Sequence, residues 1–341
     1  MNTKRLTEQD VAEAARLLAE GQLVGIPTET VYGLGANGLM PEAVKAIFAA
    51  KGRPQDNPLI LHVPSDTWLE RYCEDIPETA YELTRRFWPG PLTLILKHRD
   101  MIPCEVTAGL PTVGMRCPKH PVTQAILEQA DVPVAAPSAN TSGRPSCTTA
   151  EDVLEDMDGK IAAVVDGGPC RVGVESTILD LTCDPPRLLR PGGLTLEALE
   201  EVLGRVEVDA AVLRPMGKGE KPRAPGMKYR HYAPKAQVTV IKGDPERTAA
   251  YIREKMRDKT GILCFDEYVP YFEGQVTVSM GPKDDQSEQA RRIFDALRAF
   301  DREDVDEILA QCPREDGLGR AVCNRMNKAA GFRQVCLEDE A

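Results

Sequence analysis

The stretch AAKGRPQDNPLILHV, residues 49–63, places Lys51 and Arg53 between an alanine-rich helical pattern and an apolar strand. The chain has a formal net charge of -11, so two adjacent cations are a local exception. An ammonium and a planar guanidinium suit an anion with several oxygens, such as a phosphate. Alternatively, Lys51 complements the negative end of the preceding helix dipole, and Gly52 caps the helix. Taken alone, the stretch favours this second interpretation.

Three further segments place similar side chains at the end of an apolar strand. With the first stretch they form a set of four: PTETVYGLGAN (27–37), KGRPQDNPLILHV (51–63), APSANTSGRPS (136–146) and GVESTILDL (173–181). Loops that leave an α/β sheet at strand ends are where ligands usually bind. Any one Ser, Thr or Asn is more simply explained as a helix or turn cap. All four segments together favour a binding site.

The glycines of GLGANG match the dinucleotide pattern G-x-G-x-x-G at Gly33, Gly35 and Gly38. In a dinucleotide fold the first glycine follows the strand directly, and an acidic residue closes the next strand about 20 residues on. Here PTETVY intervenes, and the only acid at that distance, Asp56, lies in a proline-flanked loop. We therefore predict a tight turn, with a nicotinamide enzyme as a minor alternative.

The elements that position these segments alternate between strand-like and helical patterns. The first helix is predicted to begin at Thr7, where the Thr-x-x-Asp spacing to Asp10 suits a capping box. The next helix is predicted to open at Pro41. This alternation predicts an α/β sheet with helices packed on it.

The stretch between about Leu203 and Pro234 is rich in Pro, Gly and Lys and has no apolar period, so it is predicted to be a linker. We expect a catalytic domain over 1–207, a linker or lid over 208–236, and a small accessory α/β domain over 237–341.

Composition excludes several classes of protein. The 341 residues suffice for about two domains. No apolar run reaches the roughly 20 residues that span a bilayer, so we expect a cytoplasmic protein without membrane contact. The ten cysteines form no C-x-x-C pair, which indicates neither a zinc site nor a redox dithiol. The excess of acidic residues argues against an extended basic surface that binds nucleic acid.

The order of the motifs carries a resemblance. K-x-R, S-x-N, ESTI and RPG, introduced by PTETVYGLG, resemble the YrdC-like domain of L-threonylcarbamoyladenylate synthases. The tail APGMKYRHYAPKA with a following α/β domain resembles the two-domain form of that family, so the resemblance covers nearly the whole chain. Ala224 stands where the family often has Ser, and Cys117 where it has an aliphatic residue. The resemblance implies a twisted open mixed sheet flanked by helices and a small Rossmann-like C-terminal domain.

The same resemblance implies a reaction. L-threonine, bicarbonate or CO2, and ATP would give threonylcarbamoyl-AMP and pyrophosphate, for N6-threonylcarbamoyladenosine next to the tRNA anticodon. ATP would be a substrate, Mg2+ would come with the nucleotide, and we assign no metal ligand to the protein. The downstream partner would be the tRNA threonylcarbamoyl transferase machinery, with weak tRNA binding as a further expectation. The anion beside Lys51 and Arg53 would then be the ATP triphosphate.

Site residues follow by matching positions to the family motifs. Lys51 and Arg53 are the catalytic candidates. The resemblance assigns ATP binding to Arg53, Asn57, Thr112, Ser138, Asn140, Ser146, Arg190 and the linker residues Tyr229 and Tyr232. It assigns threonine binding to Thr30, His62, Arg116, Ser176 and the backbone near Ala136. Without the motifs, His62 is more simply a core histidine, Arg116 could equally form a surface ion pair, and the tyrosines could pack between domains.

Two other classes compete. A carbamoyl-transfer enzyme of hydrogenase maturation has a similar nucleotide domain, but also an acylphosphatase-like segment and Cys-rich zinc motifs, which this sequence lacks. A YrdC-like RNA-binding module, without catalysis, is the second rival. The net charge, the 5% aromatic content and the threonine-site residues weigh against RNA binding as the primary role.

Overall fold

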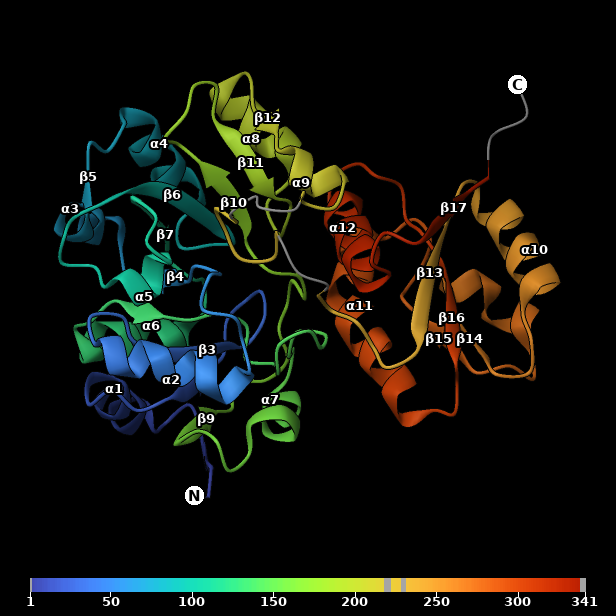
Figure 1. Cartoon of the computed structure of the whole chain (residues 1–341), viewed down its shortest axis with the longest axis horizontal. Helices are drawn as coiled ribbons and strands as arrows, with labels where there is room; N and C mark the ends of the chain where they lie inside the picture. Colours follow the sequence, from blue (N-terminus) through green and yellow to red (C-terminus); the bar gives the residue numbers. More distant parts are fainter. Residues whose placement is uncertain (1, 218–221, 228–230, 338–341) are drawn as a thin grey trace. The chain divides into compact units, whose positions relative to one another are not determined.

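The computed structural model describes residues 2–217, 222–227 and 231–337. It divides into two compact units, Met1–Ser142 with Ser146–Lys228, and Gly143–Pro145 with Tyr229–Ala341 (Figure 1). None of the helices in this described part combines the length and apolar character that crossing a bilayer requires.

One mixed sheet forms the centre of the first unit. Its strands are β1 (Lys4–Leu6), β2 (Val24–Ile26), β3 (Gly33–Asn37), β4 (Ile60–His62), β5 (Cys73–Glu74), β6 (Leu92–His98), β7 (Thr112–Arg116), β8 (Val134–Ala135), β9 (Ala163–Val165), β10 (Thr177–Asp180), β11 (Arg187–Arg190) and β12 (Glu207–Val208). In the described residues their order is β1-β9-β2-β3-β8-β4-β7-β6-β10-β11-β12, with β5 paired to β6. Parallel pairs such as β4 with β7 adjoin antiparallel pairs such as β6 with β7, which confirms the predicted mixed sheet.

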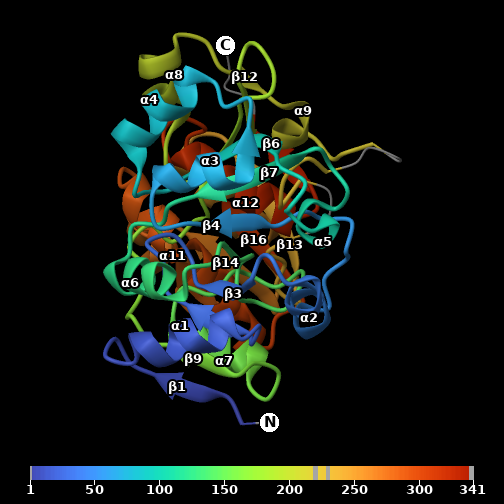
Figure 2. The same ribbon diagram turned by 90° about the vertical axis from the view of Figure 1, so that its left-hand side faces the viewer.

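Helices cover both faces of this sheet. They are α1 (Val11–Ala19), α2 (Pro41–Lys51), α3 (Leu69–Tyr72), α4 (Glu78–Phe87), α5 (Cys104–Thr107), α6 (Pro121–Ala130), α7 (Ala150–Met157), α8 (Leu196–Leu203), α9 (Ala210–Leu213) and the 3-10 turn η1 (Asp66–Trp68). Helices α1 and α6 pack together through Leu18 and Ile126, in one buried cluster with Val134 (Figure 2). Ile47 of α2 lies in another cluster with Leu61. Leu61 is paired with Ala135, so these two residues point to one face of the sheet, and the neighbouring Val134 points to the other. The two clusters therefore lie on opposite faces.

The second unit is a smaller α/β sandwich. Its elements are β13 (Gln237–Lys242), α10 (Pro245–Lys255), β14 (Thr260–Cys264), η2 (Asp266–Phe272), β15 (Thr277–Ser279), α11 (Gln286–Ala299), η3 (Phe300–Arg302), β16 (Glu307–Gln311), α12 (Gly319–Ala329) and β17 (Gln334–Cys336). The strands are all parallel and lie in the order β15-β14-β16-β13-β17. This arrangement confirms the predicted Rossmann-like C-terminal domain.

The start of the first helix differs from the prediction. Helix α1 begins at Val11, not at Thr7. The Asp10 carboxylate accepts from both the backbone N–H and the hydroxyl of Thr7, each at 2.7 Å, so it closes a turn ahead of the helix. The Thr-x-x-Asp spacing is compatible with both arrangements, because the same side chains can stabilise a turn or a cap.

Two of the three glycines of GLGANG differ from the prediction. Gly33 and Gly35 lie in strand β3, which is buried along its whole length, whereas Gly38 lies in the turn that follows the strand. A Cβ at Gly35 would lie 3.0 Å from Val134, and one at Gly38 would lie 2.5 Å from Leu61. These glycines permit close packing against neighbouring strands, a role that a periodicity argument cannot distinguish from a turn.

Part of the predicted linker is structured within the first unit. Helix α9 lies in it, and Ala211, Ala224 and Met227 are buried in a cluster with Ile60, Ile95, Ile178 and Leu189 of the sheet. Arg223 forms an ion pair with the buried Asp180. The domain limits at 207 and 237 remain a prediction, but the segment up to Met227 packs with the first unit.

Candidate active site

Lys51 ends α2 with its side chain turned into the protein. It is 2% exposed, and its ammonium donates to the backbone carbonyls of Ser138 and Asn140. Its own carbonyl accepts from the backbone N–H of Ser142 at 2.8 Å. Lys51 therefore connects the K-x-R segment to the S-x-N segment. Burial lowers the pKa of Lys51 to about 7, and the charge of Arg53 acts in the same direction.

Arg53 follows a left-handed turn at the helix end. Gly52 has a φ of +62°, which glycine adopts without a Cβ clash, and it ends α2 as predicted. The Arg53 side chain is buried and Nη2 donates to Pro58 O at 3.2 Å. Asn57 is 1% exposed, and within the described residues its Oδ1 has no hydrogen-bond partner. A buried acceptor without a donor is costly unless a ligand supplies one.

The S-x-N segment is ordered by its own side chains. Ser138 Oγ donates to Asn140 Oδ1 at 2.6 Å, and Asn140 Nδ2 donates to Thr141 O at 2.8 Å. Ser146 is fully buried and donates to Glu175 Oε1 at 2.7 Å. This bond connects the loop to the ESTI segment.

The predicted threonine residues meet in a buried ion-pair network. Arg116 Nη2 lies 2.8 Å from both Glu29 Oε1 and Thr30 Oγ1. Glu29 Oε2 also accepts from Lys119 N at 2.9 Å. Because Arg116 and Glu29 are each less than 10% exposed, the pair is shielded from solvent and depends on these bonds. Glu29 was not among the predicted residues, although its place in PTET was visible.

His62 lies beside Arg116 at the carboxyl ends of β4 and β7, where the two residues are paired in register. It is 3% exposed, and Nδ1 lies 3.4 Å from Ile60 O. Burial, together with the charge of Arg116, lowers the pKa of His62 to about 3. The imidazole is therefore neutral at physiological pH and can recognise a ligand only as a neutral hydrogen-bonding group.

Ser176 connects the RPG segment to Thr93, the residue of β6 that is paired with Arg116. Its hydroxyl lies 2.8 Å from Thr93 Oγ1 and 3.2 Å from Arg190 Nη2. Arg190 also donates to Ser176 O at 2.9 Å. A Cβ at Gly192 would lie 2.2 Å from Glu175 O, so only glycine allows the RPG turn to approach ESTI this closely. Arg190, predicted to bind nucleotide, thus adjoins Ser176, predicted to bind threonine.

Strand register separates the remaining predicted residues. Thr112 begins β7 and is paired with Lys97 of β6. The start of β7 lies beside the start of β4, and Asn57 lies just before β4 in the chain. Arg116 ends the same strand, and opposed residues of neighbouring strands point to one face, so His62, Arg116 and Thr93 share a face. Ala136 N donates to Ile60 O at 3.0 Å. Asn57 and Thr112 therefore lie toward the amino ends of β4 and β7, and His62 and Arg116 at the carboxyl ends. Two candidates depart from this division: Ala136 lies at the first residue of β4, and Arg190 lies level with Arg116.

The structure describes only one of the two linker tyrosines that were predicted to bind ATP. Tyr229 lies outside the described residues. Tyr232 is buried in the second unit, where its ring centroid lies 5.1 Å from that of Phe294 and 5.5 Å from the Arg325 guanidinium. In the first unit, Arg190 Nη1 donates to Pro225 O at 3.4 Å, so the APGM part of the linker touches a predicted nucleotide residue.

A cavity of about 470 Å³ lies beside the ion pair of Arg116 and Glu29. Thr28 and Glu29 line one side, and Lys119, His120 and Arg171 line others. Thr28 Oγ1 lies 2.9 Å from Thr30 Oγ1. Glu29, the partner of Arg116, is thus shared between the ion pair and a cavity whose lining carries both signs of charge.

Two family models match this chain. The family model Sua5_yciO_yrdC, described as telomere recombination, matches residues 16–192, and the model for the C-terminal domain of threonylcarbamoyl-AMP synthase matches residues 194–331.

Curated relatives match over nearly the whole chain. The chain is 48% identical to a threonylcarbamoyl-AMP synthase of Pyrococcus abyssi, over 97% of each protein. It is 46% identical to that of Bacillus subtilis, over 98% of this chain and 97% of the relative. The crystal structure of P. abyssi Sua5 complexed with L-threonine superposes with a TM-score of 0.90 at 45% identity, covering 99% of this chain and 100% of that one. The chain belongs to the threonylcarbamoyl-AMP synthase family, in the form that carries the additional C-terminal domain.

Proposed function

We propose that this chain makes threonylcarbamoyl-AMP and pyrophosphate from L-threonine, bicarbonate and ATP, and so supplies the intermediate for N6-threonylcarbamoyladenosine in tRNA. The observation that carries the proposal is a pair of buried polar groups on neighbouring strands. Arg116 bonds Thr30, Ser176 lies within hydrogen-bond distance of Thr93 and Arg190, and Thr93 is paired in register with Arg116. The relatives that match the full chain are named for the same product. ATP and tRNA are cytoplasmic, and we expect the enzyme to work there.

The reaction needs positioning more than covalent catalysis. The threonine amine combines with bicarbonate to give a carbamate and water. A carbamate oxygen then attacks the α-phosphorus of ATP, the new O–P bond forms, and the bond to the leaving pyrophosphate breaks. Charge accumulates on phosphate oxygens during this displacement, so fixed positive charge lowers the barrier.

Roles follow from burial and chemistry. Arg53 can hold phosphate oxygens through its guanidinium, and the Asn57 amide oxygen can accept a hydrogen bond from the nucleotide. Lys51 holds the backbone of the S-x-N segment and places an ammonium beside Arg53. Arg116 can share its guanidinium between Glu29 and the threonine carboxylate. Mg2+ is expected to arrive with ATP and neutralise the pyrophosphate, and a tRNA threonylcarbamoyl transferase is expected to consume the product.

The pKa of Lys51 gives a pH prediction. A folded-state pKa of about 7 means that the ammonium is charged below neutral pH and loses its proton as the pH rises through that value. If its charge assists ATP binding, kcat/KM for ATP falls above about pH 7, because this parameter reports the unliganded enzyme. Lys51→Arg keeps its charge and should remove the decline. The same decline in both proteins would show that another group, such as the threonine amine, is responsible.

The buried hydroxyls and imidazole predict amino-acid selectivity. Valine lacks the threonine hydroxyl and would leave buried polar groups of Thr30, His62 or Ser176 without a partner, which costs about 1–3 kcal/mol, or roughly 5- to 150-fold. Serine lacks only a methyl group and should lose about 1 kcal/mol. Pyrophosphate release is measured with ATP, bicarbonate and each amino acid. Equal release with valine and threonine would refute the proposed pocket, and release without any amino acid would refute the synthase.

A further inference from the structure

The second unit has a topological switch point that the proposed reaction does not use. From β13 the chain passes β16 to reach β14, whereas from β16 it passes β13 to reach β17. Right-handed crossovers in opposite directions place α10 and α12 on opposite faces of the sheet. The loops after β13 and β16 therefore diverge, and the crevice outside their carboxyl ends is the usual place for a ligand in such a sheet.

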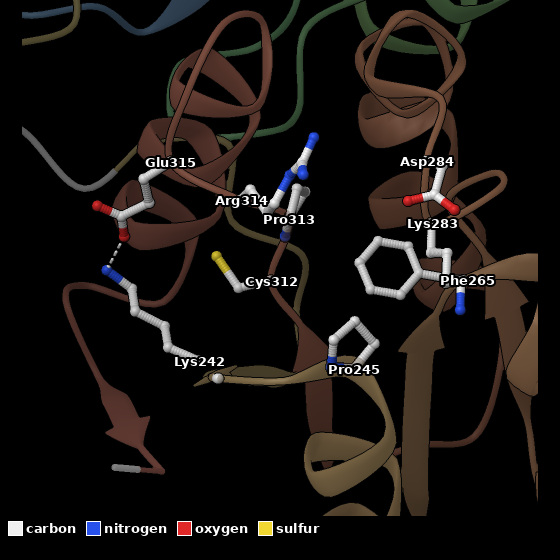
Figure 3. A pocket seen from close by; sticks show the side chains of 10 residues that line it. Lys242, Pro245, Phe265, Lys283, Asp284, Cys312, Pro313, Arg314 and Glu315 are labelled. Carbon is white, nitrogen blue, oxygen red and sulfur yellow. Dashed lines mark hydrogen bonds and ion pairs between the residues drawn. The ribbon is translucent and has the colours of Figure 1, made fainter. Parts of the chain in front are cut away.

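A cavity of about 470 Å³ occupies this place (Figure 3). Lys242 at the end of β13 and Glu315 after β16 form one side, and Phe265 and Asp284 lie opposite. Cys312, the residue after β16, lies between these two sides. The cavity thus brings a thiol, two carboxylates and three cations, those of Lys242, Lys283 and Arg314, to the ends of three parallel strands.

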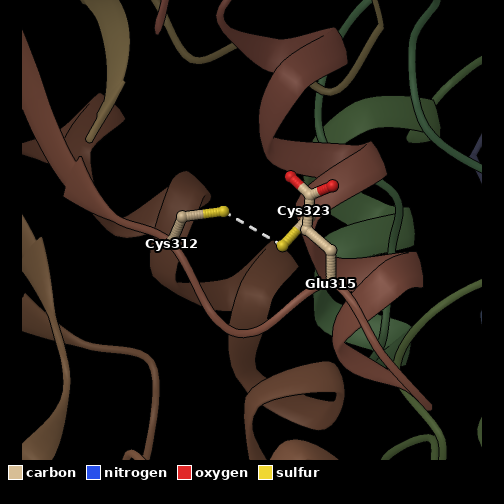
Figure 4. A group of neighbouring side chains, drawn as sticks. All are labelled: Cys312, Glu315 and Cys323. Atoms are coloured by element: carbon tan, nitrogen blue, oxygen red, sulfur yellow. Dashed lines mark hydrogen bonds between the residues drawn. The ribbon is translucent and has the colours of Figure 1, made fainter. Parts of the chain in front are cut away.

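Two thiols and one carboxylate converge at the wall of this cavity (Figure 4). The Sγ atoms of Cys312 and Cys323 are 3.0 Å apart, and the Cys323 thiol donates to Pro313 O at 3.1 Å. Ligand atoms of both cysteines and of Glu315 all lie within 4.8 Å of one another. Both cysteines are less than 10% exposed, whereas the Glu315 side chain is half exposed. The group is therefore buried on its sulfur side and open on its carboxylate side.

Cys312 is fixed by the sheet and Cys323 by the helix. Cys312 N donates to Ile241 O at 3.1 Å, which ties it to the end of β13. Cys323 lies in the second turn of α12. In a tetrahedral zinc site two thiolates, each about 2.3 Å from the metal, lie about 3.8 Å apart. The sulfurs would need to separate by less than about 1 Å, which side-chain rotation can supply.

We propose that Cys312, Cys323 and Glu315 bind a zinc ion whose fourth position faces the cavity. Thiolates select soft or borderline metals such as Zn2+ over Mg2+ and Ca2+. Two thiolates and one carboxylate would give the zinc site a net charge of -1. Lys242, whose ammonium pairs with Glu315 Oε1, offsets that charge and leaves the second carboxylate oxygen for the metal.

A disulfide between Cys312 and Cys323 is the competing arrangement. It would explain the two adjacent sulfurs but would give no role to Glu315 or to its partner Lys242. The convergence of a third ligand, a compensating cation and an open cavity on the sulfur pair favours the metal. Spacing alone could not suggest it, because ten residues separate the cysteines and the carboxylate lies between them.

Titration of the full chain with Co2+ tests the site. The protein is stripped with a chelator under a phosphine reductant, without nucleotide, and Co2+ is added. One equivalent should produce sulfur-to-cobalt charge-transfer absorption and tetrahedral d–d bands, and Zn2+ should remove both. Cys312→Ser and Cys323→Ser should abolish the charge-transfer band, and Glu315→Gln should weaken binding by at least about ten-fold.

Matched variants and a thiol count make the test decisive. Cys336→Ser, at an exposed cysteine of the same unit, and Glu273→Gln, at an exposed glutamate, should bind as the parent does. Glu315 is half exposed, so Glu315→Gln should fold even if a serine variant does not. Unchanged absorption in Cys312→Ser and Cys323→Ser, or unchanged affinity in Glu315→Gln, would overturn the proposal. So would a pair of thiols that titrate only after reduction, with no cobalt band, since that result identifies a disulfide.

Discussion

A Lys51→Met variant is expected to lower kcat/KM for ATP by about 10²- to 10³-fold. Methionine keeps most of the buried stem but removes the charge and the donors to Ser138 O and Asn140 O. Loss of one preorganised donor next to developing negative charge costs about 2.7–4 kcal/mol of transition-state stabilisation. The two carbonyls also lose a donor, at about 1–3 kcal/mol of folding stability. A coupled pyrophosphate assay and thermal unfolding measure the two effects separately.

Lys45→Met is the matched control for this variant. Lys45 lies on the same helix, is half exposed, and pairs with Glu42 at 2.8 Å on the surface. Such exposed pairs contribute about 0–1 kcal/mol, so the control should retain full turnover. If Lys51→Met turns over as fast as Lys45→Met, Lys51 is a structural residue and the phosphate assignment is wrong.

An Arg116→Met variant should lose about 10³-fold in kcat/KM for threonine and be destabilised by about 3–5 kcal/mol. The lost turnover reflects removal of a buried group that can bind a carboxylate. The lost stability arises because Glu29 remains as a buried charge without its partner 2.8 Å away. Steady-state kinetics with varied threonine and denaturant unfolding provide both values.

The double variant Glu29→Gln with Arg116→Met separates these causes. Without the buried carboxylate it should regain much of the stability, but threonine use should remain low because the guanidinium is still absent. Arg187→Met is the control, since Arg187 pairs with Glu207 at 3.3 Å where both side chains are more than a third exposed. Recovery of threonine-dependent turnover in the double variant would show that Arg116 does not bind the substrate.

Strand and helix order were predictable because apolar periodicity and proline positions are local signals. Helix α2 begins at Pro41 as expected. Local signals gave wrong predictions where the same residue types are compatible with two kinds of local structure. Thr7 and Asp10 make a turn instead of a cap, and Gly33 and Gly35 lie in a closely packed strand instead of a turn. In both cases tertiary neighbours decide, and they are invisible in the sequence.

The motifs of the candidate site were predictable from the sequence, but the hydrogen bonds and ion pairs between them were not. The motif order identified Arg116 and Lys51, yet no sequence argument indicated that Arg116 is bound by Glu29 or that Lys51 donates to two carbonyls. Both depend on strand register between segments more than 80 residues apart. Likewise, the low apolar content of the linker concealed the burial of Ala224 and Met227 on the sheet.

Mass spectrometry of the reaction product shows most directly which atoms the enzyme joins. The full chain is incubated with ATP, L-threonine and carbon-13-labelled bicarbonate, and the mixture is quenched rapidly. The account predicts threonylcarbamoyl-AMP that carries one labelled carbon, with pyrophosphate formed in equal amount before any hydrolysis. Labelled product should be absent when threonine is omitted and reduced strongly in Lys51→Met. Release of pyrophosphate with unlabelled threonyl-AMP, or with no adduct of threonine at all, would contradict the account.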